Sequence, residues 1–145
     1  MIFISWSGER SKQLGLAIRQ WLRRVLQSVE PYFTEVDIDK GAAWHTEIAE
    51  ALKKSNVGLI ILTQDNLTSP WIMFEAGAIA RSVERPRVCP ILFGIRTADL
   101  SGPLSLFQAA EFSQEGLRSV VSTINKTMQK PLDEAALADT FEMWW

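Results

Sequence analysis

The stretch Val57–Leu62 (VGLIIL) is an uninterrupted apolar run near the middle of the chain. Such a run is typical of a strand that is buried on both faces of a parallel sheet. Other short β-rich segments lie before and after it, and helical stretches separate them. These segments are Met1–Ser5, Pro31–Val36, Val88–Phe93 and Ala110–Phe112. The sequence therefore predicts a sheet of about five parallel strands, in which Pro90 indicates a strand end or an edge strand.

Apolar residues at helical spacing predict the elements between these strands. In Ser11–Val29, the residues Leu14, Ile18, Trp21 and Leu22 recur at intervals of three and four. Further helices are predicted over Trp44–Lys54, Pro70–Val83, Ser113–Met128 and Leu132–Trp145. The alternation predicts an α/β fold, a flavodoxin-like doubly wound sheet with helices on both faces.

Composition limits the function classes. The chain has 145 residues, 47% of them hydrophobic and 22% charged, which is typical of one soluble globular domain. The net charge of −2 gives no basic footprint for direct nucleic-acid binding and no polybasic membrane anchor. No apolar run reaches the ~20 residues that span a bilayer. We expect neither nucleic acid nor membrane as a partner of this domain.

Domain organisation and compartment follow from the same counts. We expect a single domain over residues 1–145, with a core over 1–128 and a C-terminal helix over 132–145. The apolar end Met143–Trp145 leads us to expect that the natural polypeptide continues, with this chain as its N-terminal part. A single cysteine, Cys89, favours the reducing cytoplasm, and one histidine with one cysteine predicts no metal site.

Ligands of doubly wound sheets bind outside the carboxyl ends of the strands, which selects four loops. These loops are Trp6–Arg10, Asp37–Trp44, Thr63–Trp71 and Gly94–Gly102. In the first, N–H groups at a helix N-terminus can hold phosphate, but one glycine is weak support and a simple capped turn is the favoured local interpretation. In the second, a solvated loop is the local interpretation of its two carboxylates.

The segment Ser69-Pro70-Trp71-Ile72-Met73-Phe74-Glu75 is the most informative motif. Ser69 and Pro70 fit an N-cap and a first helical position. Trp71 and Glu75 are four residues apart, so they share one face of the helix. An aromatic plate beside a carboxylate suits a planar cationic ligand. A core tryptophan, with Glu75 paired to an arginine, is the alternative that this spacing leaves open.

Together these segments resemble Toll/interleukin-1 receptor (TIR) domains, above all bacterial NAD-consuming ones. Phe3-Ile4-Ser5-Trp6-Ser7 resembles the first sequence box of the family, with Trp6 at a position where tyrosine is usual. Residues 37–44 lie where the family has its BB loop, here with Gly41-Ala42 in place of the proline-glycine pair of animal signalling members. Ser69-Pro70-Trp71-x-x-x-Glu75 resembles the segment that carries the catalytic glutamate. The resemblance covers Met1 to about Met128.

The resemblance implies an NAD⁺ nucleosidase that cleaves the bond between nicotinamide and ribose. Glu75 is the expected catalytic residue. The expected substrate-binding residues are Trp71, Ser7, Gly8, Arg10, Phe33, Asp37 and Trp44, and Asp65 is a weaker candidate near the same rim. NAD⁺ is the substrate, and no cofactor is expected.

Assembly and biological role also follow from the resemblance. It implies self-association through the BB loop (residues 37–44), activation by assembly, and a C-terminal sensor module beyond this chain. It further implies an effector of bacterial anti-phage defence.

Several alternatives stay open. A TIR cyclase would make a cyclic ADP-ribose isomer with the same carboxylate. A non-enzymatic interaction module would use the same loops, with Glu75 in a salt bridge. A phosphoacceptor receiver domain is disfavoured, because Glu9 is the only acid in the first loop and no lysine follows the fifth strand. An NAD(P) oxidoreductase is disfavoured because the first loop lacks the glycine fingerprint.

Overall fold

Strand β3 (Val57–Leu62) lies at the centre of the sheet, and all of its residues are buried. The protein is described by a computed structural model over residues 2–6, 8–33, 57–67, 88–100, 105 and 107–145. β3 pairs with β1 (Ile2–Ser5) on one side and with β4 (Val88–Leu92) on the other. β2 (Pro31–Phe33) and β5 (Ala110–Glu111) are the outer strands.

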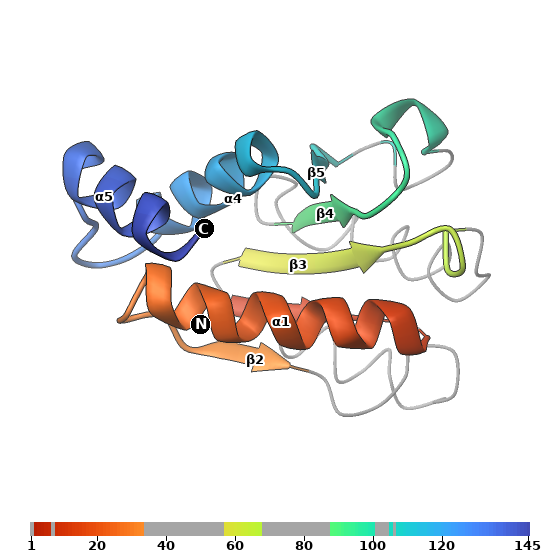
Figure 1. Cartoon of the computed structure of the whole chain (residues 1–145), viewed down its shortest axis with the longest axis horizontal. Coiled ribbons are helices and arrows are strands. Elements are labelled where there is room, and N and C mark those ends of the chain that lie inside the picture. Colours follow the sequence, from red (N-terminus) through yellow and green to blue (C-terminus); the bar gives the residue numbers. More distant parts are fainter. Residues whose placement is uncertain (1, 7, 34–56, 68–87, 101–104, 106) are drawn as a thin grey trace.

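The strand order is β2-β1-β3-β4-β5, and every pairing is parallel. This is the flavodoxin-like order, in which the chain adds β2 on one side of β1 and then crosses to add β3 on the other. The predicted α/β sheet of about five parallel strands is thereby confirmed (Figure 1).

Three helices, α1 (Glu9–Val25), α4 (Gln114–Lys126) and α5 (Glu134–Trp144), share one hydrophobic core with one face of the sheet. In Figure 1, α1 runs alongside the strands, and α4 and α5 lie together beside it. Alternate strand residues point into this core. Its strand members are Ile2, Ile4, Val57, Leu59, Ile61 and Ile91.

The opposite face of the sheet is buried as well, because the intervening residues Phe3, Ile60 and Leu62 are at most 8% exposed. The helices predicted over 44–54 and 70–83 lie outside the described residues.

The predicted limits of the first helix were wrong at both ends. α1 begins at Glu9 rather than Ser11 and ends at Val25 rather than Val29. Leu26 has φ −121° and ψ 88°, so the chain leaves the helix there. Leu26 and Val29 are nevertheless buried in the core. Their burial extends the apolar pattern past the helix, which explains the overestimate.

Pro90 lies within β4, and β4 lies between β3 and β5, so the predicted strand end or edge was wrong. The N–H of Phe93 donates to Leu62 on the β3 side, and the carbonyl of Leu92 accepts from Phe112 on the β5 side. Because successive residues alternate, the nitrogen of Pro90 faces β5. Pairing with β5 starts only at Ile91, so the missing donor removes no ladder bond.

An aromatic cluster attaches α5 to α1. The Phe141 ring stacks on Trp145 with centroids 5.5 Å apart and meets Trp21 edge-on at 5.7 Å. The Trp21 indole also donates a hydrogen bond to the carbonyl of Trp144, at 3.1 Å. At the start of α5, the Asp133 side chain accepts from the N–H of Ala136, at 2.8 Å, as an N-cap.

Candidate functional site

Three of the four selected loops are described in part, and they meet at one edge of the sheet. The first turn of α1, the turn after β3 and the segment after β4 lie together at the right-hand edge of Figure 1, where the arrows of the strands point. The loop over residues 37–44 lies outside the described residues. The carboxyl edge is therefore built from segments that are far apart in the sequence.

An ion pair joins the first of these segments to the second. Arg10 Nε lies 3.5 Å from Asp65 Oδ2, and the two side chains are 61% and 60% exposed. Arg10 comes from the first turn of α1, which follows β1, and Asp65 comes from the turn after β3. A longer contact joins the second segment to the third. The Gln64 side-chain amide donates to the carbonyl of Gly94, which follows β4, at 3.4 Å.

Asn66 fixes the turn that carries Asp65. Its Oδ1 accepts from the N–H of Thr63 at 2.9 Å, and its Nδ2 donates to the carbonyl of Ile61 at 3.1 Å. The N–H of Asn66 also donates to the carbonyl of Thr63, at 3.3 Å. Asn66 is only 2% exposed. A buried asparagine that bonds to its own turn is a common way to hold such a loop.

Gly8 is the N-cap residue of α1 and has a backbone conformation that favours glycine. Its φ of +86° lies in the left-handed region, and no atom of the described residues would come within 4 Å of an added Cβ. Its carbonyl accepts the first helical bond from Lys12, at 3.0 Å, and no described side chain caps the helix. The first turn of α1 therefore presents its N–H groups and Arg10 at the carboxyl edge.

The end of β1 is buried beside this turn. Trp6 is 5% exposed, and Lys12 Nζ lies 5.4 Å from the centre of its ring, within cation–π range. The hydroxyl groups of Ser5 and Thr63 are buried and find no hydrogen-bond partner among the described residues. The carboxyl edge thus combines the buried ring of Trp6 with the buried hydroxyl groups of Ser5 and Thr63.

Of the residues predicted for the site, the structure places Gly8 and Arg10 at this edge and pairs Arg10 with Asp65. The backbone of Phe33 ends β2. The remaining candidates, namely Glu75, Trp71, Ser7, Asp37 and Trp44, lie outside the described residues.

The sequence reasoning missed Gln64 and Asn66. An Asp-Asn pair shortly after a buried strand is a turn signal that could have identified the second of them.

Cys89 is not a nucleophile at neutral pH. Burial raises the pKa of its thiol to about 11, and a backbone hydrogen bond with Ala110 opposes that rise only in part. The thiol stays protonated, and thiolate chemistry is unavailable to it. Within the described ranges, no three His, Cys, Asp or Glu side chains gather to hold a metal ion. No helix in the same ranges is both long and apolar enough to cross a membrane.

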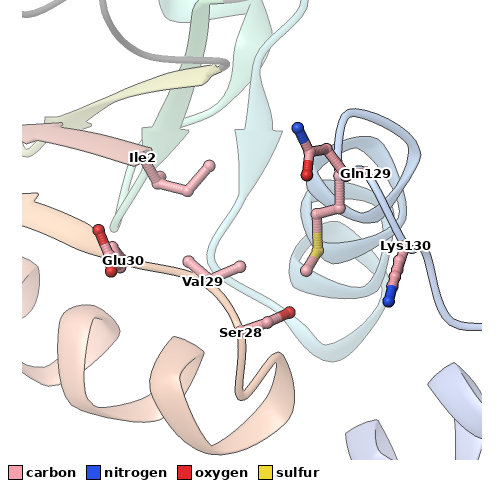
Figure 2. Close-up of a pocket in the computed structure, with 7 residues that line it drawn as sticks. Ile2, Ser28, Val29, Glu30, Gln129 and Lys130 are labelled. Atoms are coloured by element: carbon pink, nitrogen blue, oxygen red, sulfur yellow. The ribbon is translucent and has the colours of Figure 1, made fainter.

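A hollow of about 420 Å³ lies at the opposite edge, where the strands begin. Figure 2 shows Ser28, Val29 and Glu30 on one side of it, with Gln129 and Lys130 across from them. None of the predicted site residues that the structure describes lines it. The carboxyl edge is therefore the candidate site.

Comparison with known proteins identifies the family. Residues 2–123 match the sequence model of the TIR domain, so the chain belongs to the TIR domain family. No curated protein sequence matches it.

Among solved structures, the chain is similar to a metazoan TIR-STING receptor from C. gigas in complex with 2′,3′-cGAMP. The TM-score is 0.60 at 22% sequence identity, over 90% of this chain and 40% of that one. The chain thus spans less than half of that receptor, and the similarity shows a shared fold.

Proposed function

We propose that the protein is an NAD⁺ glycohydrolase that cleaves the bond between nicotinamide and ribose. Membership of the TIR family over residues 2–123 carries the proposal, together with the Trp71–Glu75 spacing. The carboxyl-edge position of Gly8 and Arg10 supports it, because both belong to the predicted substrate site.

The chemistry needs one carboxylate. Glycoside hydrolases use two, since the oxygen of the leaving group must be protonated. Nicotinamide leaves NAD⁺ from a pyridinium and departs as a neutral molecule, so no acid is needed. As the C–N bond breaks, its electron pair goes to the ring nitrogen, and Glu75 stabilises the positive charge on the ribose. Water then attacks the ribose carbon and loses a proton, which gives ADP-ribose.

The other candidates bind the substrate. Arg10 and the N–H groups beside Gly8 suit the diphosphate. Trp71 provides a stacking wall, with Phe33 or Trp44 as a second one. Ser7 and Asp37 contact polar groups of the substrate at the same rim.

Self-association through residues 37–44 completes the active site in this proposal, and a sensor module C-terminal to the domain triggers it. The TIR-STING receptor offers a parallel for a TIR domain within a longer protein, because the similarity covers only 40% of the length of that receptor. We place the protein in the bacterial cytoplasm, as an effector of anti-phage defence.

The test is NAD⁺ consumption by the concentrated, purified domain with a crowding agent, with nicotinamide measured by chromatography. Glu75→Ala should reduce turnover by about 10² or more, as expected for a central catalytic group. Glu115→Ala removes an exposed carboxylate from the first turn of α4 and is the matched control. Turnover of Glu75→Ala within tenfold of the wild type would refute the proposal. The product peaks separate ADP-ribose from a cyclic isomer.

A further inference from the structure

The Arg10–Asp65 ion pair lies at the point where the strand order reverses. β1 has β2 on one side and β3 on the other. The connection after β1 leads to one side of it, and the connection that enters β3 leads to the other side, so the switch point lies between β1 and β3. Flavodoxin-like folds bind their ligands at this switch point. Arg10 follows β1, Asp65 follows β3, and the two side chains meet between them. An anion that binds there meets a cation that already has a partner.

The side chains of Asp65 and Arg10 differ in how far they can move. Asp65 has a short side chain on a turn that the buried Asn66 fixes through two side-chain hydrogen bonds. Arg10 has a long side chain that is mostly exposed, so its guanidinium can turn toward a solute. Both side chains are about equally exposed, so the difference lies in their length and in the fixed turn: the carboxylate has the shorter reach, and the guanidinium is the more movable partner.

We propose that Asp65 is a positioning residue that holds Arg10 at the β1/β3 switch point and competes with an anionic substrate group for it. The identity of that group as the NAD⁺ diphosphate rests on the proposed function. When the diphosphate binds, it replaces the single carboxylate on Arg10 with a more highly charged partner. Asp65 thus keeps Arg10 oriented in the absence of substrate and lowers the affinity for the substrate.

The experiment titrates the purified domain with inorganic pyrophosphate at fixed ionic strength and follows binding by NMR. Asp65→Asn should tighten binding roughly two- to fivefold, the range expected when an exposed ion pair no longer competes. Arg10→Gln should weaken binding. In the Arg10→Gln background, Asp65→Asn should have almost no effect. Asp65→Glu, which keeps the charge, should restore the affinity of the wild type.

Glu30→Gln is the matched control, because it removes an exposed carboxylate at the opposite edge of the sheet. Three results would overturn the proposal. In the first, Asp65→Asn leaves binding unchanged or weaker. In the second, Glu30→Gln or the Arg10→Gln background gives the same tightening as Asp65→Asn. In the third, pyrophosphate does not bind the wild type.

The two proposals fail separately. Asp65-dependent pyrophosphate binding without NAD⁺ cleavage would keep the anion site and refute the glycohydrolase. Cleavage that depends on Glu75, without any effect of Asp65 on pyrophosphate binding, would support the glycohydrolase and refute the role of Asp65.

Discussion

Asn66 shows how one buried polar side chain can organise the candidate site. It satisfies the N–H of Thr63 and the carbonyl of Ile61 at the end of β3, and both bonds are buried. Buried backbone groups that lose their partners cost free energy, because water cannot replace those partners. The turn that presents Asp65 to Arg10 therefore depends on a residue that lies beneath the surface.

Asn66→Ala should lower the free energy of unfolding by about 1–3 kcal/mol, because two buried backbone groups lose their partners. Chemical denaturation of the purified domain measures this change. Gln64→Ala is the control on the same turn, since Gln64 is exposed and makes a long 3.4 Å bond. It should change stability by less than about 0.5 kcal/mol. A loss for Asn66→Ala that is as small as the one expected for Gln64→Ala would show that the bonds of Asn66 add no stability.

At the scale of elements, local patterns predicted which segments form helices and strands better than where those segments end. Leu26 and Val29 continue the apolar spacing of α1 although the helix ends at Val25. The spacing of apolar residues indicates which residues are buried, not which are helical. Leu26 and Val29 are buried in the segment that leads from α1 to β2. Pro90 is the converse case, in which a local rule was offset by tertiary structure: β5 begins to pair one residue beyond it.

Gly116 determines how closely α4 approaches β5. A Cβ at this position would lie 2.0 Å from the carbonyl oxygen of Glu111, which is a backbone atom. Gly116→Ala should therefore destabilise the domain by about 1–2 kcal/mol, because the overpacking cost exceeds the gain in helix propensity. Thermal denaturation tests this expectation.

Ser119→Ala is the control for Gly116→Ala, since Ser119 is exposed on the same helix. It should leave the melting temperature unchanged or slightly raised. An increase in stability for Gly116→Ala would show that α4 can shift away from β5 without cost.

At the scale of the whole molecule, the sequence predicted the class of fold, and it selected the edge of the sheet at which the candidate site lies. The apolar run at β3 and the alternation of elements suffice for both, because parallel strands need crossover connections. The sequence predicted Gly8 and Arg10 for the site, and both lie at that edge. It did not predict the Arg10–Asp65 pair, since that contact depends on how two distant loops meet. The roles of Glu75 and Trp71 stay predictions.

The last prediction concerns assembly, which belongs to no single residue. If residues 37–44 of one copy complete the active site of the next, the active species is an oligomer. Its fraction, and with it the turnover per molecule, then rises with protein concentration by mass action. The net charge of −2 offers little self-repulsion against association. NAD⁺ cleavage per molecule should therefore rise steeply over roughly a hundredfold range of protein concentration, and again on crowding.

Two controls make the test of assembly specific. Light scattering on the same samples should show the increase in mass that accompanies the increase in activity. Substitution of Gly41 and Ala42 by bulky residues should remove both increases, while circular dichroism reports an unchanged fold. Specific activity that stays flat across the range, with Glu75-dependent turnover present, would show that one copy of the domain is a complete enzyme. A sensor module of the kind proposed would then have to act by releasing inhibition rather than by bringing copies together.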